Sequence, residues 1–305
     1  MAWADQESRP YKVAALVGAL CGSFVLPEKQ ISTVVEYNMC TMTGYYESGE
    51  IEGEYLSEPA LAAGARHCLR HVSPLPDVLR CMKQGFAGSP PNPGDLGELV
   101  CILSLLECME AAVQAHSTVP NDVMFPVVSI RDLAKQIIPL SILSEGDFPD
   151  DEFVSFNHFV RLPRSQFSES SERKDTAYGR CAAVVAYFNE AGIDGFIPVV
   201  KQDGTLGEWD VQIKNRKRAG EPASGRGDYP MLFIEMGDES VQAKRISLSR
   251  GQSRAVYYLS MWRAPFFEST NGSQVLDELK KTAALSRRGR SGIAYKRKFP
   301  RSSRV

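Results

Sequence analysis

The spacing of apolar residues changes along this chain. Up to His116 it follows the three-to-four-residue period of helices, whereas from Ala182 onward short apolar runs alternate with turn residues. The helical period predicts helices over Tyr11–Leu20, Pro27–Tyr37, Glu58–Val72 and Asp95–His116. Before the third of these, Cys40–Tyr46 and Ile51–Leu56 flank a turn with a glycine and predict a β-hairpin. We therefore expect a mostly helical first part.

The later part of the chain has the composition of a β-sheet. Ala182–Phe188, Ile193–Val200 and Glu208–Asn215 are rich in the β-branched and aromatic residues that favour strands. Between the last two, Gln202-Asp203-Gly204-Thr205 predicts a hairpin turn. A further strand is expected over Met231–Met236, and an amphipathic helix over Gln274–Leu285. The order helix, three-strand meander, strand and helix predicts an α+β sheet domain.

Three regions follow from these patterns. Residues 1–90 are expected to form a helical unit, and their order of helix, helix, hairpin and helix allows a winged-helix-like arrangement. A Pro- and Gly-rich linker, Gly85–Gly94, leads into a core at residues 91–285. Residues 117–175 are interpreted as an insertion in that core. It holds a short helix at Ile130–Ile138, an aromatic run at Val154–Val160 and an exposed, mobile polar loop at Ser165–Thr176.

The remaining residues, 286–305, form a basic tail. The tail carries eight basic residues and no acidic one, although the formal net charge of the chain is −2. This asymmetry is typical of a segment that contacts nucleic acid or directs targeting, and a solvated terminus explains it equally well. The cluster Lys296-Arg297-Lys298 also admits nuclear targeting.

Composition narrows the classes of protein. The chain is 43% hydrophobic and 24% charged, which is typical of globular proteins. No apolar run approaches the roughly 18 residues of a membrane span, so we expect no membrane partner. Seven cysteines without a CxxC pair favour a reducing, intracellular compartment over a disulfide framework. The four histidines have no cysteine partners at ligand spacing, which argues against a zinc site.

The residues that can carry chemistry lie on the predicted sheet. Asp194 opens the middle strand, and Gln212 and Lys214 lie two residues apart on the next strand, so their side chains share a face. A hairpin between these strands would bring the three side chains together. Glu98, one turn into the long helix, can supply a further oxygen. Carboxylate and amide oxygens bind hard cations such as Mg²⁺, and a nearby lysine can orient water or stabilise negative charge.

This constellation resembles the PD-(D/E)XK, or restriction-endonuclease-like, nuclease superfamily. Gln212 stands where Glu is commoner, and Gly195 where the family tends to carry a large apolar residue. Over about residues 55–240 the chain is also similar to the nuclease-like C-terminal regions of fungal Crinkler or retrotransposon-hot-spot-type proteins. The blocks that carry this likeness are Tyr55–Ala62, Gly94–Leu99, Phe156–Val160, Gly192–Asp194, Ile197–Val199 and Val211–Asn215.

The resemblance implies a restriction-endonuclease-like α-β-β-β-α-β core and a nuclease that depends on Mg²⁺ or Mn²⁺. Asp194, Gln212 and Glu98 would be the metal ligands, and Lys214 would be the catalytic base or electrostatic group. The expected partner is nucleic acid, with DNA as the substrate, and an NTPase module that often precedes the nuclease-like region would be missing from this chain. The alternatives are a catalytically inactive nucleic-acid-binding or effector module that keeps the fold, and an interaction protein whose N-terminal helical unit docks a partner.

Three other polar residues invite a functional interpretation. Asp210 shares the face of Gln212 and Lys214, which makes it a possible extra ligand. His158 lies in the aromatic run, and we expect a packed histidine there more than a catalytic base. Glu235 could be a distant ligand, but its place in Met231–Met236 favours the exposed face of an edge strand.

Overall fold

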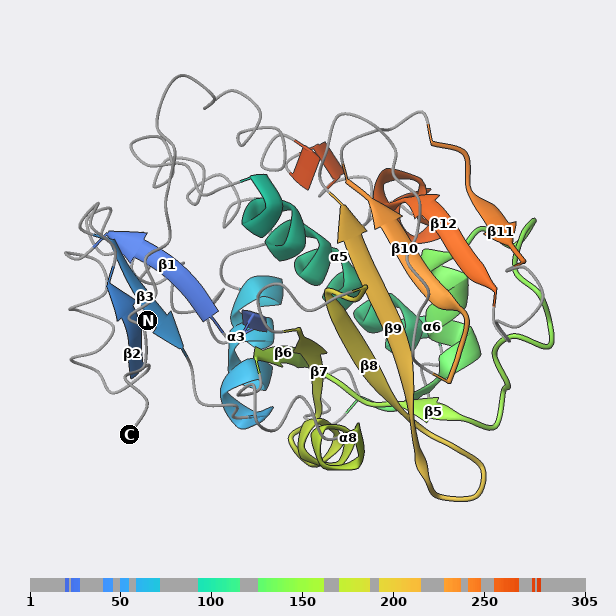
Figure 1. Ribbon diagram of the computed structural model, residues 1–305, viewed down its shortest axis with the longest axis horizontal. Coiled ribbons are helices and arrows are strands. Elements are labelled where there is room, and N and C mark those ends of the chain that lie inside the picture. Colours follow the sequence, from blue (N-terminus) through green and yellow to red (C-terminus); the bar gives the residue numbers. More distant parts are fainter. Residues whose placement is uncertain are drawn as a thin grey trace.

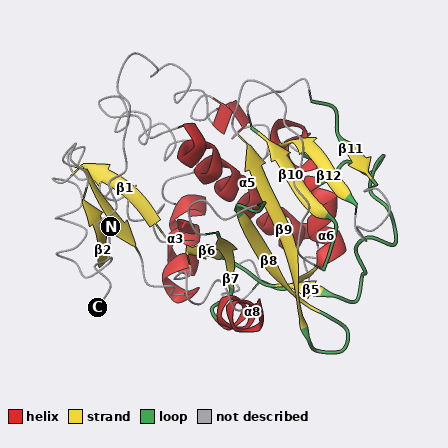
Figure 2. Cartoon of the chain, viewed as in Figure 1, coloured by secondary structure: helices red, strands yellow, loops and turns green. Residues whose placement is uncertain are grey.

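A large mixed β-sheet dominates the computed structural model, and helices cover it (Figure 1). Figure 2 shows the mixed α+β character of the chain. The structure describes residues 20–21, 23–27, 41–45, 50–54, 59–71, 93–115, 126–161, 170–186, 192–214, 228–236, 241–247, 255–268, 276–277 and 279–280. The basic tail, residues 85–92 of the linker and most of three predicted helices (Tyr11–Leu20, Pro27–Tyr37 and Gln274–Leu285) lie outside these residues, whereas Pro93 and Gly94 of the linker are helical.

The region before residue 90 contains a small sheet beside a helix. Strands β1 (Ser23–Pro27), β3 (Glu50–Glu54) and β2 (Thr41–Tyr45) pair antiparallel in that order. The pairing of β2 with β3 confirms the predicted hairpin. Helix α3 (Pro59–His71) confirms the predicted helix that follows. The region expected to be helical thus holds a three-stranded sheet as well.

The predicted long helix is confirmed as α5 (Pro93–Ala115), most of whose described side chains are buried. Arg66 of α3 donates to the Leu106 carbonyl oxygen at 3.2 Å and pairs with Glu110 at 2.5 Å. These contacts join α3 to α5. Helix α6 (Ile130–Ile137) then packs against α5, and its buried residues repeat at helical spacing. Ile130, Leu133, Ala134 and Ile137 form that apolar stripe.

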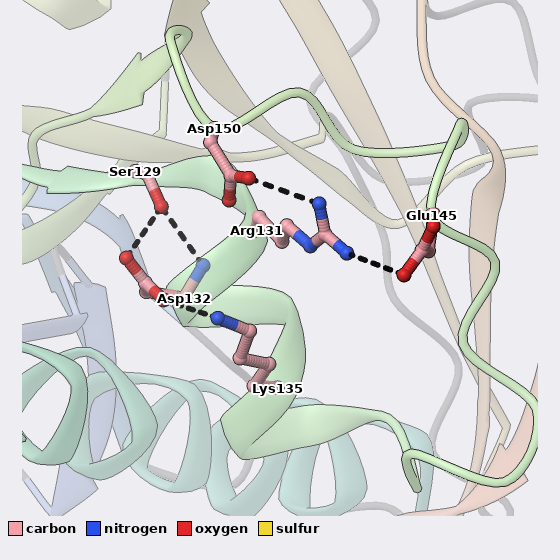
Figure 3. A network of polar contacts seen from close by, with 6 residues as sticks. All are labelled: Ser129, Arg131, Asp132, Lys135, Glu145 and Asp150. Atoms are coloured by element: carbon pink, nitrogen blue, oxygen red, sulfur yellow. Dashed lines mark hydrogen bonds and ion pairs between the residues drawn. The ribbon is translucent and has the colours of Figure 1, made fainter.

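Helix α6 begins in a polar network at the surface (Figure 3). The Ser129 hydroxyl caps the helix by accepting from the Asp132 amide at 3.1 Å, and Asp132 in turn pairs with Lys135 at 2.8 Å. Beside it, Arg131 donates to Asp150 at 2.9 Å. A serine cap satisfies one of the amides that the first helical turn leaves without a partner. The network therefore stabilises a helix end.

The three-strand meander that the sequence predicts is confirmed. Strands β7 (Ala182–Val185), β8 (Gly195–Val200) and β9 (Leu206–Lys214) pair antiparallel in sequence order. The predicted turn joins β8 to β9, and Gly204 adopts a φ of +81° there. Asp203 stabilises the turn by accepting from the amide and the hydroxyl of Thr205 at 2.9 and 2.7 Å.

Beyond the meander, strands β10 (Met231–Glu235) and β12 (Val256–Ser260) extend the sheet in parallel with β9. Strand β11 (Lys244–Ile246) pairs antiparallel with β12 and ends the sheet among the described residues. Three short strands complete the other side: β4 (Val128–Ser129), β5 (Phe153–Val154) and β6 (His158–Arg161). Strand β5 pairs with β8, and β6 with β7, so residues 126–161 contribute directly to the main sheet.

Both faces of the central strands are covered. The first face packs on α5 and α6 and carries Trp209, Val211 and Ile213 of β9. The second face carries the alternate positions, among them Phe196 of β8 and Phe233 of β10. Helix α8 (Ser170–Gly179) contacts β7, β8 and β9 and contributes Ala177 to this second face.

The prediction of a polar loop at Ser165–Thr176 was wrong for its second half. Residues 162–169 lie outside the described residues, but Ser170 begins helix α8. The helix has almost no apolar stripe, and this hid it from a search for helical spacing. Its buried contacts come from Ala177 and from the charged side chain of Arg173, which is 6% exposed.

Gly195 allows a close approach between β7 and β8. A Cβ atom at this position would lie 2.5 Å from the Val184 carbonyl oxygen, which is backbone and has little room to move. We expect Gly195→Ala to lower the free energy of unfolding by about 1–3 kcal/mol, because the strands must separate. Gly64→Ala is the matched control, since a Cβ on Gly64 of α3 meets no atom within 4 Å. Urea unfolding measures both; equal stability of the two variants would contradict the steric argument.

Candidate active site

The β8–β9 hairpin brings two of the predicted residues into contact at its open end. Asp194 immediately precedes β8, and Lys214 is the last residue of β9. The Lys214 ammonium lies 3.1 Å from Asp194 Oδ2, and the same oxygen accepts from the Ile213 amide at 2.6 Å. The Asp194 backbone also bonds to Val211 and Ala186, both at 2.9 Å. Asp194 is thus fixed on the backbone and on the side chain, on the same side of the sheet as Lys214.

This ion pair is open to solvent. The side chains of Lys214 and Asp194 are 28% and 20% exposed, respectively. Oδ2 of Asp194 accepts both hydrogen bonds, and Oδ1 has no donor among the residues that the structure describes. One carboxylate oxygen therefore remains available for a ligand that approaches from solvent.

Gln212 and Asp210 precede Lys214 on the same strand and are more deeply buried. Gln212 is 7% exposed and Asp210 is fully buried, whereas Val211 and Ile213 between them pack on the helices of the first face. The expected alternation along β9 is therefore confirmed. Gln212 stands between Asp210 and the partly exposed Lys214, so Gln212 lies nearer to the open end of the hairpin than Asp210 does.

Glu98 on α5 approaches the same region from the helix side. Its neighbour one turn later, Cys101, is fully buried. Burial raises the pKa of the Cys101 thiol well above its usual value, and Coulombic interactions, among them those with Asp194 and Glu98, raise it further. Because Coulombic interactions weaken with distance, Asp194 and Glu98 both lie near this thiol. Helix α5 also contacts β9 directly.

These donors can be compared with the needs of a hard cation. Mg²⁺ keeps several waters and takes one or two carboxylates from a protein. Asp194 Oδ1 is an available carboxylate oxygen, and an amide oxygen from Gln212 adds a neutral ligand. Among the described residues, no three His, Cys, Asp or Glu side chains gather closely enough to hold a metal ion. The donor set fits a largely hydrated cation better than one held in a cage of protein ligands.

The interpretation of Glu235 as an exposed residue on an edge strand is wrong. Strand β10 lies between β9 and β12, and Glu235 is fully buried. Its register partners are Lys214 of β9 and Ser260 of β12. The continuous apolar run Met231–Ile234 was the sequence signal of a buried strand, because parallel strands that are buried on both faces consist of such runs.

Arg173 and Glu208 form a buried ion pair on the second face of the sheet. Arg173 of α8 donates to Glu208 through Nε at 2.7 Å and through Nη2 at 2.5 Å. The two side chains are 7% and 4% exposed, and the guanidinium lies 5.2 Å from the centre of the Phe196 ring. Glu208 lies at the opposite end of β9 from Lys214, so the pair fastens α8 to the sheet away from the open end.

His158 is a packed residue, as its position in the aromatic run indicated. It is 1% exposed, and its Nδ1 lies 2.6 Å from the Asn157 side-chain oxygen. Burial and then the positive charge of Arg180 lower the pKa of His158 to about 4. The imidazole is therefore neutral at physiological pH and serves packing.

We expect this histidine to make stability depend on pH. In the unfolded chain it gains a proton below about pH 6.5, whereas the folded chain gains it only near pH 4. The stabilisation is thus complete above pH 6.5, and about 3 kcal/mol of it is lost as the pH falls to 4. Urea unfolding at several pH values gives the free energy of unfolding at each pH. This free energy should change less with pH for His158→Gln than for the exposed control His67→Gln. Equal slopes would contradict the buried neutral state.

Comparisons of the chain with models of protein families, with curated proteins and with solved structures give no match. Among the described residues, no helix has the length and apolar character needed to cross a membrane.

Proposed function

We propose that this chain is a divalent-metal-dependent nuclease that hydrolyses phosphodiester bonds of nucleic acid, with DNA as the expected substrate. The observation that carries the proposal is the contact of Lys214 with Asp194 at the open end of the β8–β9 hairpin, at 3.1 Å. A carboxylate and an ammonium group that share a solvent-accessible position suit a reaction that needs both a cation ligand and a positive charge.

The order of the strands supports the same proposal. A helix, α5, packs behind an antiparallel meander, β7–β8–β9, and the next strand, β10, runs parallel to β9. This strand order is compatible with the restriction-endonuclease-like core that the resemblance implies, in which Asp194 and Lys214 would be site residues. Residues 215–227, between β9 and β10, lie outside the described residues; the sequence predicts a Gly- and charge-rich loop over Lys217–Asp228, where the resemblance implies a helix.

Each residue has a defined task in this proposal. A bound Mg²⁺ or Mn²⁺ would neutralise phosphate charge and acidify a water molecule. Asp194 would hold the cation through Oδ1, with the amide oxygen of Gln212 and the carboxylate of Glu98 as further ligands. Lys214 would orient the attacking water or stabilise negative charge on the phosphate, as a flexible ammonium group can do.

One observation favours a second candidate, an inactive nucleic-acid-binding or effector module that keeps the fold. Oδ2 of Asp194 already accepts two hydrogen bonds, and the neighbouring ligand position carries the neutral Gln212. A neutral amide at that position binds a cation more weakly than a carboxylate would. The two candidates differ in the rate of cleavage and agree in the binding of nucleic acid.

The deciding experiment incubates the purified chain with supercoiled plasmid in Mg²⁺, in Mn²⁺ and in EDTA. The nuclease proposal expects nicking with either metal and none in EDTA. A binding measurement at low salt separates the alternatives, because an inactive module would retain the plasmid without nicking it. A chain that neither nicks nor binds nucleic acid would contradict both candidates.

A further inference from the structure

One polar row crosses the carboxyl ends of three neighbouring parallel strands. Lys214 ends β9, Glu235 ends β10 and Ser260 ends β12. Glu235 is the register partner of both Lys214 and Ser260. Adjacent strands lie about 4.8 Å apart, so each of the three residues has the next as its immediate neighbour. The carboxyl ends of parallel strands are a frequent place for ligand sites in open sheets.

These three side chains also share one face of the sheet. Phe233 precedes Glu235 by two residues and stacks on Tyr258, which precedes Ser260 by two, with ring centres 5.1 Å apart. Both rings belong to the core of the second face. Because side chains alternate along a strand, Glu235 and Ser260 are directed to this face as well. Lys214 joins them there from β9.

The burial of the row increases away from the ion pair. The Lys214 side chain is 28% exposed, whereas Glu235 and Ser260 are fully buried. Within the described part of the chain, the Ser260 hydroxyl has no hydrogen-bond partner and makes no cap bond to the short helix η1 (Met261–Arg263) that it precedes. A buried hydroxyl without a partner is unfavourable by about 1–3 kcal/mol, so the Ser260 hydroxyl is a donor that the neighbouring carboxylate could use.

We propose that Glu235 is a positioning residue for Lys214, an inference that rests on the proposed metal-dependent function. Lys214 stands between two carboxylates, Asp194 on the β8 side and Glu235 on β10. In the structure its ammonium group pairs with Asp194. When a divalent cation binds Asp194, the ammonium group leaves that carboxylate and turns to Glu235. Ser260, the register partner of Glu235, then donates its hydroxyl to the same carboxylate.

The physical reason is competition for one carboxylate. A cation at Asp194 repels the ammonium group 3.1 Å from Oδ2, and the four-carbon stem of lysine lets that group move by several ångströms. Glu235 offers the displaced charge a negative partner in the adjacent strand. Without Glu235 the ammonium group loses this partner, and the cation must compete against the full Lys214–Asp194 pair. Glu235 therefore favours cation binding through Lys214 and without contacting the metal.

A double-mutant cycle on the full chain tests this coupling, with Mn²⁺ binding measured by titration calorimetry. We expect Glu235→Gln to weaken Mn²⁺ binding by about tenfold. In the background of Lys214→Gln, which has no ammonium group to relocate, Glu235→Gln should leave Mn²⁺ affinity unchanged. Asp228→Asn is the control for loss of a negative charge, because Asp228 pairs with Lys201 at the other end of β9. It should bind Mn²⁺ as the wild type does.

Other outcomes overturn the proposal in distinct ways. Equal weakening by Glu235→Gln in both backgrounds would make Glu235 a direct ligand, and unchanged affinity with a lower melting temperature would make it purely structural. If Glu235→Gln does not fold, Glu235→Asp replaces it in the same cycle, and the same dependence on Lys214 is required. Asp194→Asn should abolish Mn²⁺ binding. Undiminished binding by that variant would instead refute the proposed metal site itself.

Discussion

Glu208→Gln is expected to lower the free energy of unfolding by about 3–5 kcal/mol, far more than the loss of a surface ion pair would. The substitution removes the negative charge of the carboxylate that holds the buried Arg173 guanidinium in a bidentate pair. In the native structure both arms of this bidentate pair are short, at 2.7 and 2.5 Å, and both side chains are almost inaccessible to water. Removing one charge of a buried pair is more unfavourable than removing a surface attraction, because the desolvated guanidinium loses the charge it is bound to.

Two further variants isolate the cause of that loss, and chemical denaturation measures all three. Asp150→Asn removes one partner of Arg131 in the surface network of Figure 3, where the aspartate is 66% exposed, and should change stability by less than about 1 kcal/mol. The double variant Arg173→Met with Glu208→Leu should recover most of the loss, because apolar side chains fill a buried ion-pair site well. A Glu208→Gln protein as stable as Asp150→Asn would contradict the structural role of the pair.

Lys214→Ala should reduce plasmid cleavage by at least about 100-fold, the largest change in activity that the proposed function implies. The substitution removes the positive charge at the open end of the hairpin. Asp194 keeps its hydrogen bond from the Ile213 amide at 2.6 Å, so the carboxylate stays in position. Binding of the plasmid at low salt should therefore change little, and the defect should appear in the rate of the chemical step.

Lys201→Ala is the matched control for this variant. Lys201 pairs with Asp228 at 3.0 Å, both side chains are 30% exposed, and the pair lies at the other end of β9. The two lysine–aspartate pairs thus have nearly the same geometry and exposure, but only one lies at the candidate site. Cleavage by Lys201→Ala should equal that of the wild type. Equal loss in both variants would show that Lys214 has no special role.

The sequence predicted the part of the site that depends on local pairing. A hairpin needs a turn and two strands of matched pattern, and all three are visible around Gly204. Once the hairpin forms, the two-residue period places Gln212 and Lys214 on one face, and the antiparallel register places Asp194 beside Lys214. No contact from a distant part of the chain is needed for this result.

Features that depend on distant packing were missed. Helix α8 has almost no apolar stripe, because it is fastened to the sheet through the charged side chain of Arg173. The partner of that side chain, Glu208, is 35 residues away in the sequence. Glu235 was taken for an exposed residue because nothing near it in the sequence shows that β12 covers the second edge of β10. The pairing of β10 with β9, which is equally non-local, makes Glu235 the neighbour of Lys214.

The most direct test of the central claim is the rate of Mg²⁺-dependent plasmid nicking by the wild type and by Asp194→Asn, purified in parallel. The substitution keeps the size of the side chain and a hydrogen-bond acceptor for the Ile213 amide, but removes the negative charge that would hold a cation. We expect nicking by the wild type that EDTA abolishes, and no nicking above background by Asp194→Asn. Equal rates for the two proteins would contradict the assignment of Asp194 as the metal-binding residue.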